Sequence, residues 1–191
     1  MILTGNKIEQ AFRAGDITID PFVPENVGPN SYDVTLAREL LIYEGEVLDP
    51  RAQNHTTPIT IPEDGLVLES GELYLGSTVE RVGSNIYVAC LEGRSSLARL
   101  GLSIHQTAGF GDLGFISRWT MEIMAIRPIR VYAGMRIGQF AFHRPYGEIQ
   151  KLYRGKYGQQ EGVAVESSKS FLDREVAGAA IPTQEEKPRG A

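Results

Sequence analysis

Turn residues recur every few positions along most of this chain and separate short runs rich in β-branched and aromatic residues. Such runs occupy residues 66–69, 72–82 and 85–92 before the middle of the chain and residues 126–132 and 136–143 after it. Short strand-forming runs at this spacing are typical of an all-β domain. We therefore predict a mainly β fold.

The same alternation of apolar and polar residues occurs earlier in the chain. Tyr32, Val34 and Leu36 alternate with polar residues, which predicts a half-buried strand over residues 31–36, and residues 40–43 form a second apolar run. Residues 49–64 contain three prolines and many polar residues, so we expect an irregular segment with at most one short strand.

One short helix is predicted before these strands. Ile8, Ala11 and Phe12 lie on one face at helical spacing, Thr4 precedes them as a candidate N-cap, and Gly15 follows them as a candidate terminator. We expect this helix to serve packing.

Length and charge limit the class of protein. A chain of 191 residues with a formal net charge of −5 and pI near 5.3 suits one acidic domain and disfavours a nucleic-acid-binding surface. We expect residues 1–174 to form this domain, with a C-terminal arm over about 146–174 and a mobile tail at 175–191. No apolar run approaches membrane-spanning length, so no membrane partner is expected.

Cysteine and histidine usage limits the chemistry. Cys90 is the single cysteine, which excludes an internal disulfide and favours the cytoplasm. His55, His105 and His143 are scattered, and the sequence lacks the spacing of zinc ligands, so no zinc site is predicted.

A polar motif follows the run that ends at Glu92. Arg94, Ser95 and Ser96 would begin a short helix that ends at Gly101, and would present a guanidinium, two hydroxyls and free backbone N–H groups together. An anionic phosphate needs this chemistry. A capped helical turn with a solvated arginine explains the motif equally well.

A glycine-rich loop covers residues 107–115. It would let backbone groups approach a ligand closely, with Phe110 as an apolar wall. The alternative is a bulged β-turn that places Phe110 and Phe115 in the core. For His105, just before the loop, we favour a hydrogen-bonded structural role.

Glu122 is the sharpest single feature. Trp119, Met121 and Ile123 surround it in a segment that is otherwise typical of a buried strand. A carboxylate there is costly unless it is paired or functional, although an outward-facing strand position remains an alternative.

At these residues the chain resembles the dCTP deaminases, members of the dUTPase-like superfamily. The resemblance rests on EGRSSLARLGL (92–102), TAGF-x-D-x-GF (107–115), TMEI (120–123), SYDVTL (31–36), MRIGQFAF (135–142) and YRGKYGQQEG (153–162). It implies a distorted β-barrel or jelly roll, with short helices at the N-terminus and in the central motif. It also implies a homotrimer with active sites at subunit interfaces, and dCTP and dUTP as ligands.

The resemblance also implies residue roles. By position, Glu122 matches the catalytic glutamate, Ser95 and Arg99 match residues beside the attacking water, and the Ala108 carbonyl helps to hold that water. The positions that match substrate-binding residues are Arg94, Ser96, Thr107, Gly109, Phe110, Asp112, Thr120, Tyr153, Lys156 and Gln160. Asp112 matches the contact to the deoxyribose 3′-hydroxyl. Ala37 and Ser117-Arg118-Trp119 depart from the family pattern.

The implied reaction is zinc-free deamination of dCTP to dUTP and ammonia by water that Glu122 activates. The sequence lacks the H-x-E and P-C-x-x-C pattern of zinc deaminases. Mg²⁺ is expected on the triphosphate, without a protein-built metal site. The alternatives are a dUTPase without deaminase activity and a non-catalytic nucleotide-sensing module of the same fold.

The product is a further expectation. Gly109-Phe110 and the arm around Tyr153 resemble the family members that hydrolyse dUTP further, to dUMP and pyrophosphate. A glycine after Ala108 would leave space for a second water near the α-phosphate, with Asp112 close enough to orient it. We therefore expect a bifunctional enzyme.

Overall fold

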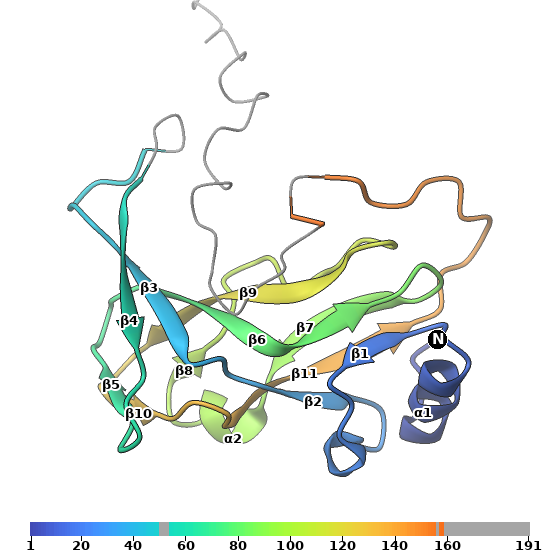
Figure 1. The fold of residues 1–191 in the computed structure, drawn as a ribbon, viewed down its shortest axis with the longest axis horizontal. Helices are drawn as coiled ribbons and strands as arrows, with labels where there is room; N and C mark the ends of the chain where they lie inside the picture. Colours follow the sequence, from blue (N-terminus) through green and yellow to red (C-terminus); the bar gives the residue numbers. More distant parts are fainter. Residues whose placement is uncertain (50–53, 156, 159–191) are drawn as a thin grey trace, which may run out of the picture.

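The computed structural model describes residues 1–49, 54–155 and 157–158 (Figure 1). The chain begins with α1 (Gly5–Arg13), which buries Ile8 and Ala11 as the sequence predicts. Gly15 follows the helix with φ +79°, a conformation that favours glycine. Thr4 occupies the N-cap position, as predicted. Its side chain makes no capping hydrogen bond, so the predicted side-chain cap is wrong.

The largest sheet is built on two long antiparallel strands, β6 (Tyr74–Gly83) and β9 (Ile116–Ala125). Four shorter strands extend it: β3 (Glu39–Tyr43) and β1 (Thr18–Asp20) pair with β6, β4 (Thr56–Thr60) pairs with β3, and β8 (Leu102–Ser103) pairs with β9. β4 is the one short strand expected within residues 49–64.

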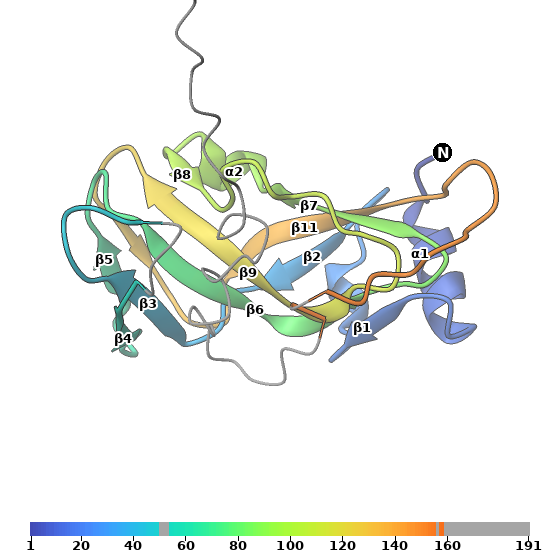
Figure 2. The same cartoon turned by 90° about the horizontal axis from the view of Figure 1, so that it is seen from above.

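A second sheet has three strands. Its central strand β11 (Arg136–His143) lies between β2 (Tyr32–Thr35) and β7 (Val88–Gly93), antiparallel to both. Both views show this sheet running beside β6 and β9, with α1 at one end of the molecule (Figures 1 and 2). A two-stranded ladder of β5 (Leu66–Leu68) and β10 (Ile129–Val131) lies at the other end.

The predicted mainly β fold is confirmed. The short helix expected in the central motif is α2 (Ser95–Ala98), and a short 3₁₀ helix, η1 (Pro24–Asn26), lies between β1 and β2. In the described part of the chain the strands form three hydrogen-bonded sheets.

The core fills the space between the sheets with aliphatic and aromatic side chains. Tyr32, Phe140 and Phe142 are its largest fully buried members, and each burial of this kind contributes about 1.5–3 kcal/mol. The Trp119 ring packs edge-on against Phe140, with ring centroids 4.7 Å apart, and its Nε1–H donates to the Val82 carbonyl at 3.0 Å. This packing fixes the part of β9 that precedes Glu122.

A buried carboxylate ties the two larger sheets together. Glu80 on β6 is 2% exposed, and its carboxylate accepts hydrogen bonds from the Thr35 N–H at 2.9 Å and the Thr35 hydroxyl at 2.8 Å. Burial raises the pKa of Glu80, and these hydrogen bonds and the charge of nearby Arg118 lower it in part.

Candidate active site

A cavity of about 540 Å³ opens beside β9, a size that suits a small-molecule ligand. Six of the residues singled out from the sequence line it: Ala108, Phe110, Asp112, Thr120, Glu122 and Tyr153. The other lining residues are Tyr43, Leu48, Leu73, Leu75, Gly111, Phe115, Trp119 and Tyr157. The structure therefore brings the candidate base, the candidate sugar contact and part of the arm to one place.

Glu122 reaches this cavity because β9 alternates its side chains. Met121 and Ile123 point into the core, so Glu122 points to the opposite face, where it is half-buried. Burial raises the pKa of Glu122, while hydrogen bonds from the Gln106 and Glu122 backbone N–H groups and the nearby His105 lower it in part. A carboxylate with a raised pKa is suited to act as a general base near neutral pH.

Tyr43 is a cavity residue that the sequence analysis did not identify. It ends β3, and burial, followed by the charges of Glu122 and Tyr157, raises the pKa of Tyr43 to about 12. Its hydroxyl therefore keeps its proton at neutral pH and can donate a hydrogen bond. The sequence around Tyr43 does not indicate a functional residue, because it resembles an ordinary strand. The pairing of β3 with β6 brings Tyr43 to the cavity.

The glycine-rich loop runs along β7. The Leu91 N–H donates to the Gly109 carbonyl at 2.6 Å, and the Gly111 N–H donates to the Ala89 carbonyl at 2.9 Å. A Cβ at position 109 would lie 2.5 Å from the Leu91 carbonyl oxygen, and one at 111 would collide with the Trp119 ring. Glycine is therefore required at both positions, because neighbouring atoms lie too close for a side chain. At Gly109 this is a second reason, in addition to the predicted space for a water.

The two loop phenylalanines have different environments. Phe110 lines the cavity and is 68% exposed, so the alternative that buries it in the core is wrong. Phe115 is partly buried and packs edge-on against Trp119, with ring centroids 5.1 Å apart. Phe110 lies on the exposed turn of a loop held through its backbone, which explains why its side chain escapes burial.

Trp119, which departs from the family pattern, lines the cavity. The sequence shows that Ser117-Arg118-Trp119 differs from the usual approach to the glutamate strand, but not that Trp119 lines the cavity. Its ring contacts both the core and the Gly111 segment of the loop.

The expected hydrogen-bonded role of His105 is wrong in one respect. Its Nδ1 is buried and has no hydrogen-bond partner among the described residues. Its Nε2 lies 4.0 Å from the Glu92 carboxylate, and the imidazole is close enough to Glu122 to affect the pKa of that carboxyl. The segment after β8 places the His105 ring near carboxylates, but no described donor or acceptor lies within hydrogen-bond distance of Nδ1.

The start of the C-terminal arm lies against the loop. The Tyr153 N–H donates to the Leu113 carbonyl at 2.7 Å, and the Tyr153 ring packs edge-on against Phe115 with centroids 5.5 Å apart. Lys156 and Gln160, which the sequence also predicts at phosphate-contacting positions, and the predicted tail at 175–191 lie outside the described residues.

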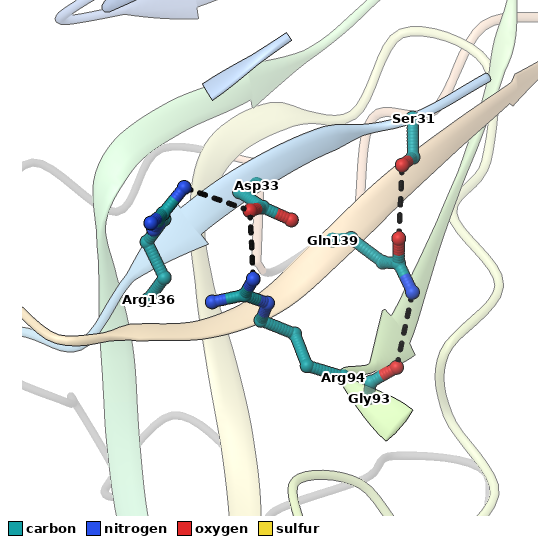
Figure 3. A network of polar contacts seen from close by, with 6 residues as sticks. All are labelled: Ser31, Asp33, Gly93, Arg94, Arg136 and Gln139. Carbon is teal, nitrogen blue, oxygen red and sulfur yellow. Dashed lines mark hydrogen bonds and ion pairs between the residues drawn. The ribbon is translucent and has the colours of Figure 1, made fainter. Parts of the chain in front are cut away.

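Residues of the central motif lie elsewhere. Arg94, Ser95, Ser96 and Arg99 sit at α2 and are not among the described residues that line the cavity, and neither are Thr107 and Gly109. Arg94 instead pairs with Asp33 on β2, Nη2 to Oδ2 at 3.3 Å (Figure 3). Within one chain, the predicted water-positioning and phosphate-binding residues of α2 are thus separate from the cavity that holds Glu122.

Two features are absent from the described residues. Among the described residues no group of three or more His, Cys, Asp or Glu side chains is arranged to hold a metal ion. In the same part of the chain no helix is long and apolar enough to span a bilayer.

The chain resembles known proteins along most of its length. A family model described as dCTP deaminase-like matches residues 2–145. A protein of Hathewaya histolytica named "dCTP deaminase, dUMP-forming" is 48% identical over 175 residues, covering 92% of this chain and 100% of the relative. A protein of Clostridium acetobutylicum with the same name is 47% identical over 163 residues, covering 85% of this chain and 94% of the relative.

A solved structure shares the fold. The crystal structure of 2′-deoxycytidine 5′-triphosphate deaminase from Agrobacterium tumefaciens aligns with a TM-score of 0.59 at 21% identity, over 75% of this chain. The alignment covers 48% of that protein, so this chain spans about half its length. The family match over residues 2–145 and the close sequence relatives show that this chain belongs to the dCTP deaminase-like family.

Proposed function

We propose that this protein hydrolyses dCTP to dUTP and ammonia and then hydrolyses dUTP to dUMP and pyrophosphate in the same site. The observation that carries the proposal is Glu122, half-buried with a raised pKa in a cavity that also contains Asp112. The names of the close relatives, "dCTP deaminase, dUMP-forming", support the same substrate and product.

In the deamination step Glu122 acts as the base. It accepts a proton from water as the water oxygen bonds to C4 of the cytosine, and passes that proton to N3. Glu122 then takes the proton of the new C4 hydroxyl and gives it to N4, so that the C4–N4 bond breaks, ammonia leaves and the C4 carbonyl forms. Ser95, Arg99 and the Ala108 carbonyl hold the water in line with C4.

The proton has to move together with the attack. Complete transfer from water, with a pKa of about 15.7, to a carboxylate with an ordinary pKa of about 4.3 costs ~15 kcal/mol. A raised pKa at Glu122 lowers this cost but leaves free hydroxide unfavourable. Concerted attack avoids that intermediate because charge does not accumulate on the oxygen.

The second step is hydrolysis at phosphorus. A water attacks the α-phosphorus of dUTP. The bond between this phosphorus and the oxygen that bridges to the β-phosphate breaks, and pyrophosphate leaves. Asp112 lines the same cavity as Glu122, so a second carboxylate is available to orient this water. Mg²⁺ enters as the counter-ion of the phosphates and is held by their oxygens and by water.

We propose a homotrimer in which the site is completed by a neighbouring copy. Ser95 and Arg99 do not line the cavity of their own chain, which is explained if they act on the cavity of another copy. Leu100 and Ile126, beside α2 and β9, are 63% and 77% exposed, which suits an interface.

Two measurements on the purified protein test the activity. Ammonia release from dCTP separates a deaminase from a plain dUTPase and from a non-catalytic module, because neither alternative releases it. Chromatography of the completed reaction then separates the two products. Accumulation of dUTP without dUMP or pyrophosphate would refute the second step and leave the first intact.

A mixing experiment tests the shared site. We expect Glu122→Gln and Arg99→Ala subunits each to be inactive alone. In random trimers formed from equal amounts, about a quarter of the sites would combine Glu122 of one copy with Arg99 of another. Unfolding and refolding the two variants together should restore ammonia release. If activity stays absent while mixed trimers form, each site is built within one chain.

A further inference from the structure

Two arginines share one carboxylate oxygen beside the three-stranded sheet. The Asp33 Oδ2 lies 3.3 Å from Nη2 of Arg94 and 3.5 Å from Nη1 of Arg136 (Figure 3). The three residues meet because β11, which starts at Arg136, pairs with β2 on one side and with β7, which leads to Arg94, on the other.

The surrounding contacts hold this arrangement. Gln139 on β11 accepts a hydrogen bond from the Ser31 hydroxyl at 2.8 Å and donates to the Gly93 carbonyl at 3.2 Å, so it links the residues that precede Asp33 and Arg94 (Figure 3). The backbone on both sides of the charged group is therefore fixed.

The group carries an excess of positive charge in an acidic protein. Two guanidinium groups face one carboxylate, whereas the whole chain has a formal net charge of −5. The Asp33 side chain is 17% exposed, and those of Arg94 and Arg136 are 30% and 49% exposed. Asp33 is thus the least exposed of the three side chains, while the arginines keep N–H groups available to solvent.

Stability alone does not account for the arrangement. Partly exposed ion pairs contribute little to stability, and one arginine would suffice to neutralise Asp33. Ser95 and Ser96 follow Arg94 directly and are exposed, so two hydroxyls lie next to one of the two guanidinium groups in the sequence. Guanidinium and hydroxyl groups together are suited to bind phosphate oxygens.

We propose that Arg136 is a further polyphosphate-binding residue, and that Asp33 is a positioning residue that holds Arg94 and Arg136 in orientation for the same polyphosphate. This rests on the proposed function only in naming a nucleoside triphosphate as the natural ligand. Asp33 pairs with one terminal nitrogen of each guanidinium, and the remaining N–H groups bind the phosphates.

The test measures binding by calorimetry at fixed ionic strength, with inorganic tripolyphosphate, dCTP and 2′-deoxycytidine as ligands. Arg136→Ala should weaken tripolyphosphate and dCTP about tenfold and leave deoxycytidine unchanged. Arg136→Lys should recover only part of the loss, because lysine keeps the charge but lacks the planar fork. The matched control is Arg13→Ala, which removes the same charge from an exposed pair with Glu9 on α1.

Asp33→Asn gives the sharpest test, because positioning and simple attraction predict opposite signs. Removing the negative charge should tighten polyphosphate binding if charge alone matters, whereas loss of the oriented arginines should weaken it. Its control is Glu9→Gln, which removes a negative charge from the exposed α1 pair.

Each outcome decides the proposal. It is overturned if Arg136→Ala behaves like Arg13→Ala, if Asp33→Asn tightens binding, or if the wild-type protein binds no tripolyphosphate. Melting temperature and oligomeric state are measured for every variant, and Arg136→Lys decides if Arg136→Ala is unstable. Arg136-dependent tripolyphosphate binding without ammonia release from dCTP would support the inference while refuting the proposed function.

Discussion

Leu75 on β6 lies directly opposite Glu122 on β9 in the antiparallel ladder. Leu75 is 5% exposed and packs with Leu41 and Tyr43 in a small apolar cluster, so the carboxylate stands against an apolar neighbour and not in open water. Desolvation by such neighbours disfavours the charged form. The register of β6 and β9 therefore contributes to the desolvation that raises the pKa of Glu122.

Replacing Glu122 by glutamine should abolish deamination and preserve substrate binding. The amide is nearly the same size but cannot accept a proton from water, so we expect kcat to fall by at least about 10²–10⁴-fold. Ammonia release and dCTP calorimetry measure the two properties separately. Turnover retained in Glu122→Gln would eliminate this residue as the base.

The same substitution should change how stability depends on pH. The pKa of Glu122 is higher in the folded protein than in the unfolded chain, so the unfolded chain loses its proton first as pH rises and wild-type stability falls across that interval. Glu122→Gln cannot titrate there. Its melting temperature should match the wild type below about pH 4 and exceed it increasingly toward neutral pH. A constant difference across this range would contradict the raised pKa.

Glu80 should be more important for stability than for activity. Glu80→Ala leaves the Thr35 N–H and hydroxyl without their acceptor, which costs about 1–3 kcal/mol, whereas Glu80→Gln keeps an acceptor oxygen and should cost less. Chemical denaturation at one protein concentration measures both. Equal stability of the alanine variant and the wild type would show that the two sheets do not depend on this link.

The loop glycines should be intolerant of a methyl group. Gly109→Ala places a Cβ 2.5 Å from the Leu91 carbonyl oxygen, and Gly111→Ala drives one into the Trp119 ring, so each should cost about 1–3 kcal/mol. Both should lose activity because Ala108 and Asp112 shift. Gly71→Ala is an informative control, since its Cβ would meet nothing within 4 Å and its cost comes only from a positive φ of +80°. Full activity in Gly109→Ala would show that the loop is free to move.

Local sequence patterns predict the mainly β class and the position of α1, which the structure confirms, and they identify Glu122 as the candidate base. Local patterns suffice for these, because strand alternation, turn residues and a carboxylate among apolar neighbours can all be identified in adjacent residues. The family motifs added Ala108, Asp112 and Tyr153, which the structure does bring to the cavity.

The surroundings of these residues depend on contacts between segments that are distant in the sequence. Tyr43 and Leu75 join Glu122 through pairing between strands distant in the sequence, and Trp119 reaches the cavity through packing against the loop. The separation of Arg99 from the cavity of its own chain is likewise invisible in the motif. Long-range register and side-chain packing decide which groups meet, and no local pattern encodes these distances.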